Sequence, residues 1–273
     1  MERRQFLVRT GLLLGAGALA AAAPPPQARS QPDGPDWDAV RDQFVLDPEK
    51  VHMSGFLLAP HPAPVRAAIA RHRDGLDRNP VDYLHANQAR LEAGVLAEAA
   101  AYLGVDPTEI ALTDSTTMGL GLFYGALRLE AGHEVLTTTH DHYSTQIALQ
   151  ERARRTGARV RTISLYRDIQ TVTAEEIVEA LLAAVRPETR VVALTWVHSG
   201  TGLKLPARAI ADALAEVNAT RDDAERALLC LDGVHGLGGE DAALRKWGCD
   251  VFIAGCHKWL FGTRGQGLVW AHP

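Results

Sequence analysis

The sequence has few cysteines, few aromatic residues and no strong excess of charge of either sign. Its three cysteines, Cys230, Cys249 and Cys256, cannot all pair with one another, and two lie in or beside apolar runs, so we expect no disulfide scaffold. A net charge of -5 gives no electrostatic reason to expect a nucleic acid as partner. With 47% hydrophobic and 22% charged residues, the chain is typical of a soluble globular protein with a large core.

The chain also lacks an apolar run long enough to span a membrane. The run from Gly11 to Ala23 is shorter than the roughly 20 residues that a spanning helix needs. It follows the paired Arg3 and Arg4 and precedes small residues and prolines, which favours a cleavable export signal over residues 1–30. The order Arg-Arg-Gln-Phe-Leu resembles a twin-arginine signal, and an ordinary secretory signal is the alternative. We therefore expect a periplasmic or secreted protein with no membrane segment after signal removal.

Helical and extended patterns alternate after a proline-rich linker. Residues 31–50 are interpreted as linker and amino-terminal segment, and residues 51–273 as one domain. Helices are predicted over residues 62–75, 86–104, 116–132, 145–157, 174–187 and 207–218, and strands over residues 109–114, 134–139, 159–165, 190–197, 227–232, 250–255 and 267–272. Several strands are near-continuous runs of Val, Ile and Leu, which indicates an α/β fold whose mainly parallel sheet is covered on both faces.

Unusual polar residues follow these strands. They are Thr113 and Asp114, His140 to Tyr143, His198 and Ser199, Asp232 and His235, and Lys258. Ligands of open α/β sheets bind at the carboxyl ends of the strands. The polar residues are therefore expected to meet in one site.

Three features of that set call for a particular ligand. In "FIAGCHKWLFGTRGQG", the amine of Lys258 follows an apolar strand, and a desolvated amine can attack an aldehyde to form a Schiff base. Asp232 ends another apolar strand and needs a cationic partner such as a protonated pyridine nitrogen, unless it is only a turn residue or helix cap. Ser115, Thr116 and Thr117 stand at a predicted helix start, where they form a phosphate cradle or a simple cap. Together these requirements describe pyridoxal phosphate.

The segments "DGVHGLGG" and "DVFIAGCHKWLFGTRGQG" resemble the class V aminotransferase family of fold-type I pyridoxal phosphate enzymes, in particular its isopenicillin N epimerase-like branch. "MSGFLLAPHPAPVRAAI", "ALTDSTTMGL" and "EVLTTTHDHYST" match in the same order, so the likeness covers about Val51 to His272. It implies a three-layer large domain with a pyridoxal phosphate site. The chain stops at "GLVWAHP", whereas relatives continue into a smaller carboxy-terminal domain, so we expect that domain to be missing.

The resemblance also implies roles for individual residues. Lys258 would bond to the cofactor and later move the Cα proton of the substrate, and Asp232 would keep the pyridine nitrogen protonated. His142 would stack on the ring, and His235 would approach its phenolic oxygen. The implied catalytic residues are Lys258, Asp232 and His142, the cofactor-binding set adds Ser115, Thr116, Thr117, Ser199, His235 and His257, and no metal is expected. Without the resemblance, each histidine reads more readily as structural.

Several positions depart from the family pattern. Ser199 stands where many relatives carry Asn, Gly255 replaces a hydroxyl residue and Thr263 replaces Pro. The missing domain normally supplies an arginine for the substrate carboxylate. Arg208, Arg221 and Arg226 do not replace it and are interpreted as solvated charges.

The expected function is therefore that of an enzyme that acts on a small amino acid or amine by transamination or epimerisation. A homodimer is expected for the full-length form. An exported module that binds the cofactor or an amine without turnover is the alternative from a different class. Cysteine desulfuration or C-S lysis is a weaker alternative, because no cysteine follows Lys258.

Overall fold

The structure, a computed structural model, describes residues 36–241 and 243–272, so the predicted export signal lies outside it. In this part, seven strands form one sheet in the order β1-β7-β6-β5-β4-β2-β3. The strands are β1 (Ile110–Thr113), β2 (Glu134–Thr138), β3 (Arg159–Ile163), β4 (Thr189–Thr195), β5 (Leu228–Asp232), β6 (Val251–Gly255) and β7 (Gly267–Ala271). Strands β2 to β6 are joined by parallel pairs, which confirms the mainly parallel sheet, and β7 runs antiparallel between β1 and β6.

The helices follow the predicted pattern with shifted ends. They are α2 (Trp37–Arg41), α3 (Ala63–Arg78), α4 (Pro80–Leu103), α5 (Thr116–Ala126), α6 (Tyr143–Thr156), α7 (Ala174–Ala184), α8 (Ala207–Asn218) and the short α9 (Leu244–Trp247). The predicted end of α3 at Gly75 is wrong, because the helix continues to Arg78 and stops where Pro80 disfavours helical backbone at Asn79. Helix α4 ends as predicted at Gly104, whose φ of 69° suits only glycine without strain.

Two apolar clusters on opposite faces of the sheet make the domain three-layered. Successive β4 residues alternate between them: Val191 and Ala193 face α5 and α6, and Val192 and Leu194 face α7 and α8. Burial on both faces explains why these strands are continuous apolar runs and not alternating ones. The same alternation points Asp232 toward the α5 and α6 side, two residues beyond Cys230.

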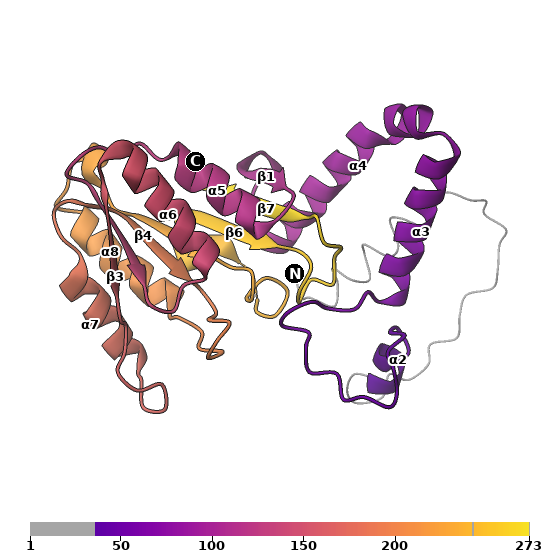
Figure 1. Cartoon of the computed structure of the whole chain (residues 1–273), viewed down its shortest axis with the longest axis horizontal. Helices are drawn as coiled ribbons and strands as arrows, with labels where there is room; N and C mark the ends of the chain where they lie inside the picture. Colours follow the sequence, from indigo (N-terminus) through magenta and orange to yellow (C-terminus); the bar gives the residue numbers. More distant parts are fainter. Residues whose placement is uncertain (1–35, 242, 273) are drawn as a thin grey trace.

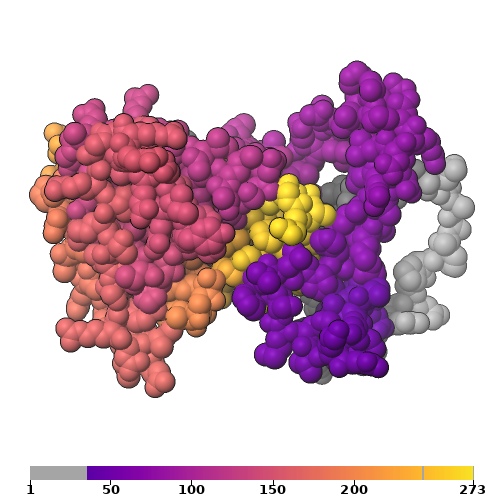
Figure 2. Space-filling view, viewed as in Figure 1, coloured from indigo at the N-terminus to yellow at the C-terminus, as the bar shows by residue number. Residues whose placement is uncertain are grey.

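Helices α3 and α4 form an arm that stands away from the sheet (Figure 1). Helix α3 buries no residue, and the segment before it runs back to the body, where the indigo residues lie beside the yellow carboxy-terminal part (Figure 2). Three contacts fix this return: Phe44 packs on Phe261 with ring centroids 5.5 Å apart, His61 Nδ1 lies 3.2 Å from the Phe261 oxygen, and Ala59 N donates to the His257 oxygen. The amino-terminal segment is thus fastened to the turn that contains Lys258.

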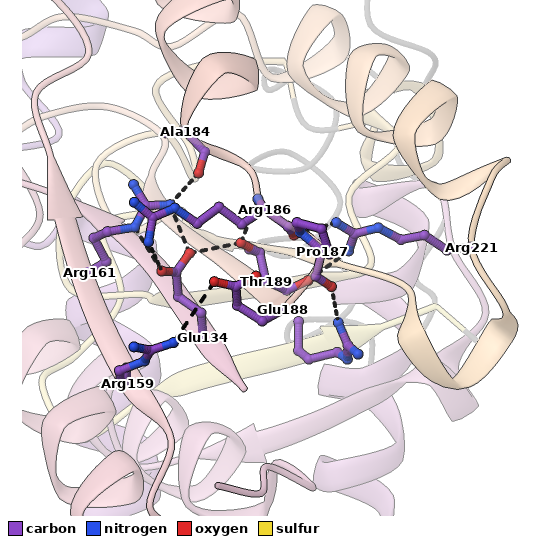
Figure 3. Close-up of polar contacts among 10 residues, drawn as sticks. Glu134, Arg159, Arg161, Ala184, Arg186, Pro187, Glu188, Thr189 and Arg221 are labelled. Carbon is purple, nitrogen blue, oxygen red and sulfur yellow. Dashed lines mark hydrogen bonds and ion pairs between the residues drawn. The ribbon is translucent and has the colours of Figure 1, made fainter. Parts of the chain in front are cut away.

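The buried carboxylate of Glu134 lies where β2, β3 and β4 begin and holds together residues from all three strands (Figure 3). Glu134 is 2% exposed and accepts hydrogen bonds from Arg161 at 2.7 and 2.8 Å and from Thr189 at 2.8 Å. Burial raises its pKa, but these bonds and the charges of Arg161 and Arg186 outweigh burial and leave the pKa lowered. Arg221 lies in the same network, where it donates to the oxygens of Thr189 and Arg186, so its interpretation as a solvated charge is wrong.

Glu134→Gln is expected to destabilise the fold by about 3 kcal/mol at pH 7, because it leaves the buried end of Arg161 without its counter-charge. A carboxylate with a lowered folded pKa stabilises the protein above its unfolded pKa and loses this effect as pH falls through the folded pKa. The deficit of the variant in urea unfolding should therefore shrink toward acidic pH. Glu188→Gln is the control, since Glu188 is 3.9 Å from an exposed Arg159. Equal losses from both variants would contradict this account.

The described residues contain no disulfide and no membrane-spanning helix. All three cysteines are free, with Cys230 and Cys249 buried, which confirms that no disulfide joins them. No helix in residues 36–241 and 243–272 combines the length and hydrophobicity needed to cross a membrane.

Candidate active site

The carboxyl ends of β5 and β6 bring Lys258 and Asp232 together. Lys258 lies in a tight turn after β6, closed by hydrogen bonds from Phe261 N to the Lys258 oxygen and from Gly262 N to the Cys256 oxygen. Its Nζ lies 3.0 Å from Nε2 of His235, so the amine points into the protein. Burial lowers the pKa of Lys258, and the charge of Asp232 opposes this shift. The amine is thus held where it loses its proton more readily than a surface lysine does.

Asp232 is the acid of the site and is 2% exposed. Burial raises its pKa to about 7, against the hydrogen bond from Val234 N at 3.1 Å, while Asp141 raises the pKa further and Lys258 lowers it. No salt bridge joins Asp232 to a cation in the described part of the chain. A buried carboxyl without an ion-pair partner is suited to receive a positively charged ligand atom.

The three hydroxyl residues at the start of α5 have different surroundings. Ser115 is the N-cap, with its Oγ accepting from Met118 N at 3.0 Å, so capping accounts for this residue. Thr117 Oγ1 lies 3.4 Å from Ser144 Oγ. Thr116 Oγ1 is buried and has no hydrogen-bond partner among the described residues. Because buried hydroxyls are normally paired, Thr116 is the member of the trio that calls for a ligand.

Gly255 brings Thr116 and His257 close to each other. A Cβ atom at this glycine would lie 2.7 Å from Thr116 Oγ1 and 3.0 Å from His257 Nδ1. The two polar atoms therefore flank one point beside the N-terminus of α5. In this arrangement a side chain at position 255 would crowd both atoms.

His142 and His235 complete the basic side of the site. His142 is the N-cap of α6, and its Nδ1 lies 3.0 Å from Ser144 Oγ and accepts from Ser144 N at 3.3 Å. Burial lowers the pKa of His142, and the charge of Lys258 lowers it further. His235 is 8% exposed, and burial, with the charges of Lys258, His142 and His257, lowers its pKa to about 4.

The site therefore holds more potential cations than anions. Burial and the charge of Lys258 lower the pKa of His257, as they do for the other two histidines. Positive charges close to one another disfavour the protonated form of each group, and a bound anion favours it again. The geometry suits a ligand with an anionic end near Thr116 and His257 and a cationic atom near Asp232.

Ser199 is the one predicted residue that the structure does not join to this network. It is exposed in the turn after β4 and makes no hydrogen bond to the other site residues in the described part of the chain. Its role toward the cofactor stays a prediction. The sequence also pointed to His140, whose ring stacks between Tyr166 at 4.5 Å and His198 at 5.1 Å and not on the Lys258 group.

Sequence reasoning missed three features of the site. Asp141 belongs to the polar run His140 to Tyr143 that the sequence singled out, but its role was not predicted: it is 7% exposed and accepts from Thr195 N on β4. Tyr124 is fully buried, and its hydroxyl has no hydrogen-bond partner in the described structure. Burial raises its pKa, and the charges of Cys230 and Asp232 raise it further. The contact of the amino-terminal segment with the lysine turn joins residues 200 positions apart. The strand-end position of Asp141 was the available signal.

Comparison with known families decides what kind of protein has this arrangement. The model of the family described as aminotransferase class-V matches residues 73–273. The chain belongs to the class-V aminotransferase family. The resemblance expected from the lysine and aspartate motifs is thus confirmed.

Relatives of this family member include more than one activity. Isopenicillin N epimerases of Streptomyces clavuligerus and Amycolatopsis lactamdurans are each 29% identical over 238 residues, covering 87% and 85% of this chain and 57% and 56% of their own length. A probable cysteine desulfurase of Vibrio cholerae is 26% identical over 181 residues, which is 65% of this chain and 41% of the relative. The chain thus spans little more than half the length of the two epimerases.

Two solved structures illustrate the fold that this chain shares. A variant of C-DES with glycine covalently linked to its PLP cofactor has a TM-score of 0.76 and 24% identity, over 88% of this chain and 60% of the other. The cysteine desulfurase CsdA of Escherichia coli has a TM-score of 0.71 and 18% identity, over 88% and 59%. These matches confirm the α/β large-domain fold.

Proposed function

We propose that this class-V aminotransferase family member binds pyridoxal phosphate through Lys258 and, as part of a whole enzyme, acts on an amino acid or amine. The observation that carries the proposal is the inward amine of Lys258, 3.0 Å from His235 Nε2 and within the field of Asp232. Family membership and the PLP cofactor of the structurally similar C-DES support it.

The residues present fit this cofactor. The unpartnered Thr116 hydroxyl and His257 flank the N-terminus of α5, where backbone N–H groups and the helix dipole favour a phosphate. Asp232 offers the buried carboxyl that a pyridine nitrogen requires. His142 would cover one ring face, and His235 would hold the phenolic oxygen side together with Lys258. Ser115 is assigned to capping the helix, and Thr117 would lie at the edge of the phosphate site.

When bound, pyridoxal phosphate supplies an electron-accepting ring that stabilises negative charge at the substrate Cα. The chain's own residues prepare this chemistry. Asp232 holds the proton on the ring nitrogen, because a cation beside it favours the ionised carboxyl. Lys258 Nζ, with its pKa lowered by burial, can accept a proton from Cα and return it. His235 keeps that amine directed into the site.

Within this chemistry we favour transamination or epimerisation. The two epimerase relatives are each 29% identical to this chain over 238 residues. Desulfuration would need a reactive thiol, and Cys256 is not suited to supply it, because burial raises its pKa to about 11 and opposes formation of its thiolate. Binding of the cofactor without turnover is the second candidate.

The experiment is to load the purified chain with pyridoxal phosphate and incubate it with single amino acids in deuterium oxide. Deuterium incorporation at Cα, followed by mass spectrometry, together with inversion or keto-acid formation, identifies the reaction. Binding of the cofactor without any exchange at Cα supports the binding module. Failure to bind the cofactor refutes the proposal.

Gly255→Ala is expected to weaken pyridoxal phosphate binding by at least about tenfold, because the new methyl group would overlap Thr116 Oγ1 and crowd His257. Equilibrium dialysis measures the change. Gly121→Ala in α5 is the matched control, since a Cβ there meets no atom within 4 Å. Unchanged affinity in Gly255→Ala would contradict the placement of the phosphate.

We also propose that the full-length form is a homodimer with its sites near the subunit boundary. An apolar surface patch made of Met118, Leu122, Tyr143 and Ile147 lies on α5 and α6 next to Thr117 and His142, and its members are 42 to 66% exposed. Their i,i+4 spacing places each pair on one face of its helix, and because α5 packs on α6 we interpret the four residues as one candidate interaction surface.

Leu122→Glu is expected to raise the dimer dissociation constant at least about tenfold, because it places a charge in the patch. Sedimentation equilibrium measures it. Ile169→Glu, at another exposed apolar position, should leave association unchanged. Equal association of both variants would exclude this patch as the interface.

The export proposal rests on residues 1–30, which lie outside the described residues. Sequencing the amino terminus of protein recovered from the periplasmic fraction tests it.

A further inference from the structure

The ladder between β2 and β4 ends before the site is reached. Its last paired residues are Leu136 and Val192, whereas β4 continues to Thr195 beside Asp232. Trp196 N donates to the main-chain carbonyl oxygen of Asp232 on the β5 side. Successive amides of a strand point to opposite sides, so the amide of Thr195 faces the β2 side. That amide has no strand partner there.

The side chain of Asp141 takes the place of the missing strand. Its Oδ1 accepts from Thr195 N at 2.5 Å, while its Oδ2 accepts from Thr138 N at 2.6 Å and from Thr137 Oγ1 at 2.8 Å. Asp141 is 7% exposed, and no salt bridge in the described structure includes it. The carboxylate thus joins the end of β2 to the end of β4.

This bridge lies between two residues assigned to the cofactor. His142 follows Asp141 directly in the chain and begins α6, and Thr195 pairs in register with Asp232. Fixing the Asp141 carboxylate on β4 therefore fixes the backbone of His142 relative to Asp232. Burial raises the pKa of Asp232 against the hydrogen bond from Val234 N, and the nearby charge of Asp141 adds to the rise while that of Lys258 opposes it.

We propose that Asp141 is a positioning residue of the site: its carboxylate bridges β2 and β4 where their ladder ends and thereby sets His142 opposite Asp232. The inference rests on the proposed function for its consequence, since the distance between these two residues defines the space for the ring. It concerns contacts that exist without the cofactor, so it can be tested separately.

The first test uses isotope-labelled protein without cofactor. In the native chain, the Thr195 amide should exchange slowly with solvent although its ladder has ended. In Asp141→Ala, exchange of the Thr195 amide should accelerate at least about tenfold. The Trp196 amide, which donates to the main-chain oxygen of Asp232, should stay protected. Thr137→Val removes only the hydroxyl donor and should leave Thr195 protected. Fast exchange of Thr195 in the native chain overturns the bridge, and this reading needs no variant to fold.

The second test measures positioning. Asp141→Asn keeps the shape but presents an amide N–H to one of two backbone donors, so the bridge loses one bond. We expect the imidazole nitrogen signals of His142 to shift and pyridoxal phosphate affinity to fall about tenfold, with Thr137→Val close to the native chain. Accelerated Thr195 exchange with unchanged His142 signals and affinity would make Asp141 merely structural and overturn the proposal. If the native chain binds no pyridoxal phosphate, the proposed function fails, and the exchange and His142 measurements still decide the bridge and its effect.

Discussion

Lys258→Ala is expected to abolish covalent attachment of pyridoxal phosphate and to lower turnover of any amino substrate by at least about 10³-fold. The physical reason is that none of the other three lysines, all of which lie in the described residues, is placed to replace it. Lys50 and Lys204 are paired with Asp47 and Glu240 at exposed positions, and Lys246 is exposed on α9. Only Lys258 is half-buried beside a histidine and a carboxyl.

Borohydride reduction followed by peptide mass spectrometry measures the attachment directly. The native chain should yield one reduced adduct, on the peptide containing Lys258. Lys246→Ala is the control and should retain that adduct in full. An adduct of equal yield in Lys258→Ala, or on another lysine of the native chain, would refute the assignment.

Asp232→Asn is expected to have opposite effects on function and on the stability of the cofactor-free protein. Asparagine cannot supply the negative charge that keeps a ring nitrogen protonated, so turnover should fall by about 10²-fold or more. Stability should rise, because the native chain keeps a carboxyl buried without a cation. Such a conflict between site and scaffold is common where activity requires an unfavourable group.

The sign of the stability effect follows from the raised pKa. In the unfolded chain Asp232 titrates near 3.8, whereas burial raises its folded pKa to about 7. Between these values the folded state holds a proton that the unfolded state has lost, so its stability falls as pH rises from about 4 to 7. Asp232→Asn should therefore match the native chain near pH 4 and exceed it above pH 7 by up to about 4 kcal/mol in urea unfolding. A variant less stable than the native chain at pH 8 would contradict the burial account.

The sequence predicts much of this fold because its strands are buried on both faces. The β4 and β5 runs read as strands directly, and helix α8 has the predicted bounds, Ala207–Asn218. The order of the strands is different, since nothing in "GLVWAH" shows that β7 enters antiparallel between β1 and β6. Hydrophobic pattern determines which face is buried, whereas neighbours in a sheet depend on contacts far apart in the chain.

The site shows the same division. Residue types at strand ends were sufficient to bring Lys258, Asp232 and His235 together. They could not divide Ser115, Thr116 and Thr117 into a cap and an unpartnered hydroxyl, because that depends on the hydrogen bond to Met118 N. Asp141 was missed for a related reason, since its partner becomes visible only where the β2 and β4 ladder is seen to end.

The position of β7 has a consequence for how a nascent chain acquires this site. Among the described strands, β1 lies at the edge of the sheet and pairs with β7 alone, and the amino-terminal segment around His61 contacts Phe261. Both partners leave the ribosome long after β1 and His61 have been synthesised. The earliest part of the domain must therefore wait unpaired for the latest, and such distant closures are slow steps in folding. Completion of the lysine turn and closure of the sheet become one late event.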